Sequence, residues 1–194
     1  MSKCYVIANL NLYEEKQMEA LQANSFESMN DYIIKNWNRT IKDPDDVILV
    51  MGKIGVGSLE EMKNIIGKLN GVKVLMDADS NPNFSREEWR EIGFNHCWDV
   101  GFCQNEGDDF IIYVNYNQKV DKHMEAALYL VSNPDSCGKR KNTLNPDALK
   151  WWYNPIAMDS VLSIYNNLKA FEQLPDSTET RSDVKELDWG GDGE

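Results

Sequence analysis

Hydrophobic positions in the first half of the chain follow two alternating patterns. Short continuous apolar runs cover residues 4–8, 47–51 and 72–76, which is typical of strands covered on both faces. Between them, residues 26–41 and 59–69 carry apolar side chains at the spacing of one helical face. Ser58, three residues before Glu61, forms a capping-box signature, and Asn70-Gly71 is expected to end that helix. This order predicts βαβ units and a largely parallel sheet.

The second half of the chain has weaker periodicity. Ser85 and Glu88 predict a short capped helix that carries Trp89 and Ile92. Residues 110–114 and 127–131 predict two more strands, and residues 159–171 predict a last helix. We therefore expect one domain over residues 1–173. Residues 174–194 are rich in acidic side chains and have the composition of a disordered tail.

Charge and cysteine usage narrow the classes of function. A net charge of -12 argues against direct nucleic-acid binding, because that affinity comes from Lys and Arg neutralising phosphates. No run approaches the 18 apolar residues of a membrane span, so we expect a cytoplasmic protein without a membrane segment. The four cysteines include no Cys-x-x-Cys pair and are interpreted as free thiols. A remote zinc site with His96 or His123 is the alternative.

Polar residues directly follow the predicted strands, where ligands bind in open α/β sheets. The glycine-rich residues 52–58 lie between a strand and a helix, but they match neither the P-loop nor the dinucleotide-binding motif. The nucleophile-elbow motif Gly-x-Ser-x-Gly is also missing, and the chain has only two histidines. The residue pattern alone therefore identifies no nucleophile and no general base.

Three stretches resemble segments of one known family. Residues 31–38, 69–76 and 151–156 read Asp-Tyr-Ile-Ile-Lys-Asn-Trp-Asn, Leu-Asn-Gly-Val-Lys-Val-Leu-Met and Trp-Trp-Tyr-Asn-Pro-Ile. They are similar to segments of the calcineurin-like metallophosphoesterases, within which the chain resembles the small stand-alone type of bacteria and their phages. The resemblance covers roughly residues 4–165. It implies an α/β fold in which a two-sheet β-sandwich is flanked by helices.

The metal-binding motifs of that family are replaced here. By the resemblance, its Asp-x-His falls on residues 9–11, its Gly-Asp on residues 52–53 and its Gly-Asn-His-Asp on residues 78–81. Its later histidine falls on residue 115, and its Gly-His-x-His falls on residues 132–135. These positions define the vestigial pocket, which consists of Asn9, Asn11, Lys53, Asp79, Ser80, Asn81, Asn115, Asn133 and Asp135.

The chemistry of this set predicts a pocket without a metal or another cofactor. Two divalent ions need anionic and imidazole ligands, and Lys53 instead brings a cation to the bridging position. We expect Lys53 to pair with Asp79, or the two to be bridged by Asn9 and Asn11. A single magnesium or calcium site on Asp79, Asp135 and asparagine carbonyls is an alternative.

These replacements predict a pseudoenzyme that acts through binding. Our main hypothesis is a module with a protein partner, such as a phage-encoded inhibitor or accessory factor of a nucleic-acid enzyme in the host cytoplasm. The alternative is a sensor or sponge for a phosphorylated small molecule or nucleotide, held in the metal-free pocket by Lys53 and the asparagines.

Overall fold

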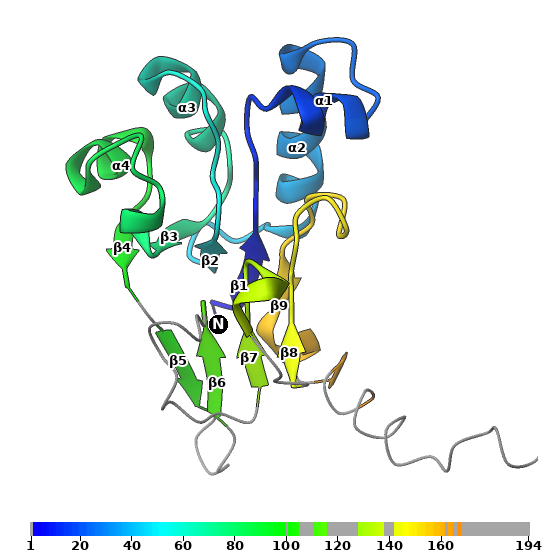
Figure 1. Cartoon of the computed structure of the whole chain (residues 1–194), viewed down its shortest axis with the longest axis vertical. Coiled ribbons are helices and arrows are strands. Elements are labelled where there is room, and N and C mark those ends of the chain that lie inside the picture. Colours follow the sequence, from blue (N-terminus) through cyan, green and yellow to red (C-terminus); the bar gives the residue numbers. More distant parts are fainter. Residues whose placement is uncertain are drawn as a thin grey trace, which may run out of the picture.

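The computed structural model describes residues 2–99, 101–104, 111–115, 128–137, 142–161, 163–164 and 167. These residues form two β-sheets with flanking α-helices (Figure 1). The expected α/β class and two-sheet arrangement are therefore confirmed. The predicted tail over residues 174–194, and most of the predicted helix over residues 159–171, lie outside the described residues.

The first sheet has five strands in the order β4-β3-β2-β1-β9. Its strands are β1 (Cys4–Ala8), β2 (Val47–Met51), β3 (Val72–Met76), β4 (His96–Trp98) and β9 (Ile156–Ala157). Strands β1 to β4 are parallel, whereas β9 pairs antiparallel with β1. The predicted parallel first half is thus confirmed, and β4 and β9 are additions to it.

The second sheet has four strands in the order β5-β6-β7-β8. They are β5 (Gly101–Gln104), β6 (Ile111–Val114), β7 (Leu128–Leu130) and β8 (Thr143–Leu144). Strands β6, β7 and β8 are parallel, and β5 is antiparallel to β6. Two of these strands, β6 and β7, were expected from the apolar pattern.

Alternate residues of the central strands contribute to two different hydrophobic cores. Val6, Leu49 and Val74 face the second sheet and pack with apolar residues of β6 and β7. Ile7 and Val50 point to the other side, where they pack with helices. Since both faces are covered, the strands can be continuously apolar, which explains the sequence pattern.

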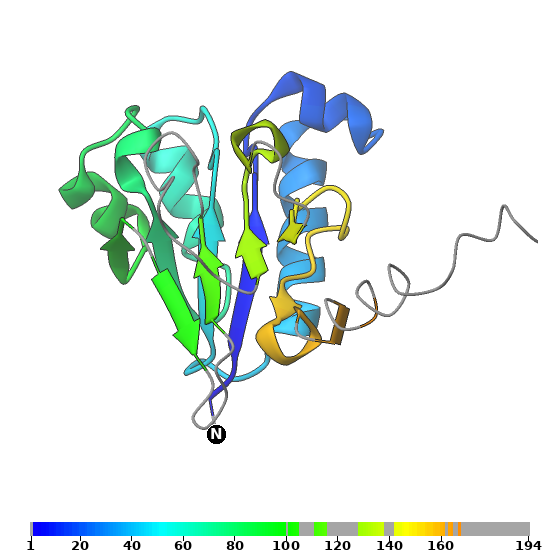
Figure 2. The same cartoon turned by 60° about the horizontal axis from the view of Figure 1, so that its bottom comes forward.

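Helices cover the outer face of the five-stranded sheet (Figures 1 and 2). The helices that contribute to this core are α1 (Glu15–Ala20), α2 (Phe26–Thr40), α3 (Leu59–Ile66) and α4 (Arg86–Ile92). Both expected capping boxes are present, at Ser58 with Glu61 and at Ser85 with Glu88. None of the described helices is both long and apolar enough to cross a bilayer.

The end of α3 differs from the expectation. The helix stops at Ile66 and not at Asn70-Gly71. Asn70 instead anchors the entry to β3, because its carbonyl accepts a hydrogen bond from Trp37 Nε1 at 3.0 Å and its N–H donates to Asn38 Oδ1 at 2.8 Å. Lys73 Nζ lies buried beside this end and donates to the carbonyls of Leu69 and Gly71. Side chains thus satisfy backbone polar groups of the segment between α3 and β3.

Candidate functional site

Four central strands end in the same unusual backbone conformation. The residues that directly follow β1, β2, β3 and β6 have positive φ angles, at Asn9 (57°), Gly52 (69°), Asp77 (58°) and Asn115 (62°). Gly, Asn and Asp are the residues that tolerate this left-handed region best. The strands therefore turn sharply at their carboxyl ends, where polar side chains were predicted to gather.

The Asn9 side chain joins several of these turns. Its Nδ2 donates to the carbonyl of Ser132 at 2.7 Å and to Asp147 Oδ2 at 3.0 Å. Its Oδ1 accepts a hydrogen bond from the backbone N–H of Lys53 at 3.3 Å. One amide thus connects the turns after β1, β2 and β7 with the segment around Asp147. Both ends of the amide are occupied within the chain.

Gly52 permits the close approach of these turns. A Cβ atom at this position would lie 2.6 Å from Ser132 Cβ and closer still to Asn9 Oδ1. Its φ of 69° also disfavours an L side chain. Glycine is required here for both reasons. It allows the turn after β2 in the first sheet to contact the turn after β7 in the second sheet.

The Asn81 side chain makes a second cross-link. Asn81 is buried, its Oδ1 accepts from the backbone N–H of Ile54 at 3.0 Å, and its Nδ2 donates to the carbonyl of Gly52 at 2.9 Å. The turn after β3 is thereby fixed to the turn after β2. Asn11 contributes through its backbone, because its N–H donates to the carbonyl of Lys53 at 3.3 Å.

Lys53 and Asp79 do not form the expected ion pair. Lys53 Nζ lies 2.6 Å from Glu14 Oε1. Asp79 lies in the 3₁₀ turn η1 (Ala78–Ser80) and pairs with Arg86 at 3.2 Å. Arg86 also binds Asp99 at 2.5 Å, and these two carboxylates raise the pKa of its guanidinium. Lys53 therefore pairs with Glu14 at the start of α1, and Asp79 pairs with Arg86 at the start of α4.

The remaining predicted residues lie toward the edge of this region. Ser80 Oγ donates to Asp77 Oδ2. Asn115 is half-buried at the end of β6. Asn133 Oδ1 accepts from the N–H of Asp135 at 3.0 Å. Both residues are exposed, Asn133 directly before the 3₁₀ turn η2 (Pro134–Cys137) and Asp135 within it. The structure therefore brings Asn9, Lys53 and Asn81 together, while Asp79 and Asp135 belong to separate surface turns.

Glu14, Asp77, Arg86 and Asp147 were missed as members of the site. Asp147 accepts from both Asn9 and the N–H of Leu149. The Asn145-Pro146-Asp147 sequence is a turn signal that indicates a loop but not its location in space. Asp77 directly follows a predicted strand, so its position in the sequence was an available signal.

The donor chemistry of the cross-linked turns does not suit a two-metal centre. The side chains that link these turns are the amides of Asn9 and Asn81, and the ammonium of Lys53 lies beside them. A pair of metal ions requires anionic or imidazole ligands instead. Among the described residues, no three His, Cys, Asp or Glu side chains form a group that could hold a metal ion. Cys97 is a free cysteine. His123 and the side chains of Cys103 and Cys137 lie outside the described part of the chain.

Comparison with known proteins gives a structural likeness. No family model matches the chain, and no curated protein matches it. The fold is similar to the crystal structure of AQ665, a protein of unknown function from Aquifex aeolicus, with a TM-score of 0.62 and 15% sequence identity. The match covers 84% of this chain and 100% of that one. At this identity the likeness concerns the fold alone, and it supports the two-sheet α/β arrangement.

Proposed function

We propose that the chain is a non-catalytic, metallophosphoesterase-like protein that acts by binding a protein partner. The observation that carries this proposal is the Asn9 cross-link. Its amide donates to Ser132 and Asp147 and accepts from Lys53, at the position onto which, by the resemblance, a metal ligand of the family falls. The strand-end turns are held together by neutral amides, so their folding requires no metal ion.

The ion pairs of Lys53 and Asp79 also support a non-catalytic role. The ammonium of Lys53 is neutralised by Glu14, and the carboxylate of Asp79 is engaged by Arg86. Nucleophilic catalysis requires a nucleophile within reach of an activating base, and these pairings provide neither. A catalytic role for Lys53 or Asp79 would first require that its ion pair be broken.

The surface supports a protein as the partner. With a net charge of -12, the chain has the electrostatic field to select and steer a basic surface. Trp98 and Trp152 are among the exposed large hydrophobic residues of the described part of the chain, and tryptophan is enriched in binding hot spots. A host nucleic-acid enzyme with a basic groove would have the positive charge that complements this acidic chain.

The phosphorylated-ligand hypothesis has less support. It needs free donors at the strand ends, but the N–H groups of Lys53 and Ile54 and the amide of Asn81 donate within the chain. Lys53 Nζ would also have to leave Glu14. No specific observation favours this second function.

Affinity capture followed by a salt titration tests the proposal. Wild-type protein is used as bait in a lysate of the cells in which the chain acts, and the captured protein is purified for calorimetry. We expect a basic partner whose dissociation constant rises at least about tenfold between about 50 and 500 mM salt, because screening weakens charge complementarity. The proposal fails if nothing is retained beyond what an unrelated bait of equal net charge retains.

A further inference from the structure

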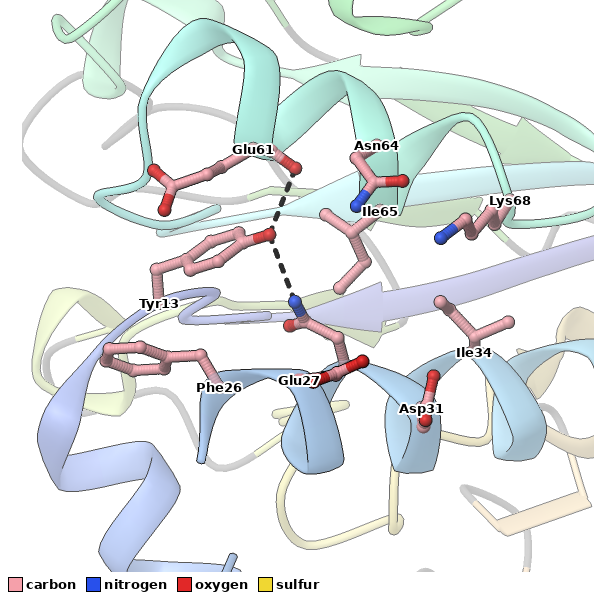
Figure 3. Close-up of a pocket in the computed structure, with 10 residues that line it drawn as sticks. Tyr13, Phe26, Glu27, Asp31, Ile34, Glu61, Asn64, Ile65 and Lys68 are labelled. Atoms are coloured by element: carbon pink, nitrogen blue, oxygen red, sulfur yellow. Dashed lines mark hydrogen bonds between the residues drawn. The ribbon is translucent and has the colours of Figure 1, made fainter. Parts of the chain in front are cut away.

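A pocket of about 330 Å³ lies between α2 and α3. Figure 3 shows Tyr13 and Phe26 at one end of it and Lys68 at the other. Phe26, Ile34 and Ile65 supply apolar walls, and the rings of Tyr13 and Phe26 are 5.6 Å apart. Its volume is that of a small-ligand site, and its lining combines these apolar walls with six polar or charged side chains.

The orientation of the Asn30 amide in this pocket follows from its hydrogen bonds. The hydroxyl of Tyr13 donates its single proton to the carbonyl of Glu61 at 3.2 Å. Asn30 Nδ2 in turn donates to that hydroxyl at 3.0 Å. Asn30 Oδ1 is left buried and has no hydrogen-bond partner in the described part of the chain. A buried acceptor without a donor is costly, so the site favours a group that supplies one.

The charged groups around the pocket favour a positive ligand. Glu27 and Asp31 lie one helical turn apart on α2, and both line the pocket. Like charges at this spacing repel each other, and a cation between them removes the repulsion. The third carboxylate, Glu61, is engaged by the backbone N–H and the hydroxyl of Ser58. Lys68 is the one lysine or arginine among the lining residues, at the end opposite to Tyr13.

We propose that this pocket binds a small organic amine, an ammonium group carried on a short apolar body. The ammonium donates to Asn30 Oδ1 and lies close to Glu27 and Asp31. The apolar body packs against Phe26, Ile34 and Ile65. Tyr13 and Phe26 add ring faces, which attract cations. This site is independent of the proposed protein partner, so either proposal can fail without the other.

A matched pair of probes tests the ligand class. 2-Phenylethylamine and 2-phenylethanol have the same body and differ in the charged group. They are titrated separately into the ¹⁵N-labelled full-length protein while backbone amide shifts are followed by NMR. We expect saturable shifts in α2 and α3 with the amine at about millimolar concentration, as befits so small a ligand. Equal binding of the alcohol, or amine-induced shifts that map outside these helices, would overturn the proposal.

Three variants test the residues. E27Q/D31N removes two exposed charges and should weaken amine binding about threefold to tenfold. E19Q removes one exposed carboxylate charge on α1, outside the pocket lining, and should stay within about twofold of wild type. Asn30→Asp adds a negative charge beside the ammonium and should strengthen binding. An E19Q effect as large as that of E27Q/D31N, or unchanged affinity in Asn30→Asp, would contradict the assignment.

Discussion

The strand-end turns and the pocket between α2 and α3 each depend on an asparagine, but the two amides are used differently. Asn9 is occupied at both ends by Ser132, Asp147 and Lys53. Asn30 donates to Tyr13, and its buried acceptor has no partner among the residues that the structure describes. An amide satisfied on both sides is a structural cross-link, whereas a buried acceptor without a donor calls for an explanation, which the proposed amine ligand supplies. The family resemblance alone directs attention to the first region.

The largest effect is expected where the strand-end turns approach most closely. Gly52→Ala places a Cβ against Asn9 and Ser132 and forces alanine into a left-handed conformation. We expect a loss of about 2–4 kcal/mol in the free energy of unfolding, measured by urea denaturation. Val56→Ala, an exposed change nearby, should cost less than about 0.5 kcal/mol. A Gly52→Ala variant as stable as wild type would mean that the turns are not closely packed.

The Asn9 cross-link is tested by restoring a carboxylate. Asn9→Asp replaces the Nδ2 donor with an oxygen that faces the Ser132 carbonyl and the Asp147 carboxylate. We expect about 2–3 kcal/mol of destabilisation in the same assay, because both acceptors lose their donor and two carboxylates meet. Asn11→Asp is the matched control and should change stability by less than about 0.5 kcal/mol. Equal effects at the two positions would contradict the special role of Asn9.

A variant of Tyr153 tests the buried hydrogen bonds that hold the segment after β1 in place. Its hydroxyl accepts from Gln17 Nε2 at 2.5 Å and donates to the carbonyl of Leu10 at 3.0 Å. Tyr153→Phe should cost about 1–3 kcal/mol at neutral pH, because Gln17 is left buried without an acceptor.

The same variant carries a pH signature. Burial raises the pKa of Tyr153 above its usual 10.0, so its neutral form stabilises the fold. This contribution is complete below pH 10 and is lost as the pH rises further, since the unfolded chain ionises first. The stability difference between wild type and Tyr153→Phe should therefore shrink above pH 10. A difference that grows with alkaline pH would contradict the burial of the hydroxyl.

The smallest effect is expected at Lys53. Its side chain is 54% exposed, and its partner Glu14 is 21% exposed. Lys53→Met should therefore change the unfolding free energy by at most about 1 kcal/mol, and high salt should reduce the difference. A larger, salt-independent loss would show that Lys53 contributes more to the site than a screened ion pair.

The sequence predicted those parts of the fold that are determined locally. The bounds of β1, β2 and β3 match the apolar runs, because strands covered on both faces leave an unambiguous pattern. Strand β9 has two residues, and its pairing with β1 depends on distant parts of the chain. Such a short element leaves no periodicity to detect.

The candidate site was predictable to a similar extent. Asn9, Lys53 and Asn81 meet because the carboxyl ends of adjacent parallel strands share one edge of the sheet. The charge partners Glu14 and Arg86 were not predictable, since tertiary packing of α1 and α4 decides which carboxylate reaches which cation. The pocket between α2 and α3 also arises from the packing of these two helices, and we recognised no sequence motif that predicts it.

Metal content measured together with phosphodiester hydrolysis tests the central claim most directly. The purified protein is incubated with excess manganese, desalted, and examined by elemental mass spectrometry, while hydrolysis of a generic phosphodiester is followed with manganese present. We predict far less than one bound equivalent of manganese and no turnover, because amides and a lysine occupy the strand ends. One to two retained equivalents with turnover would contradict the account.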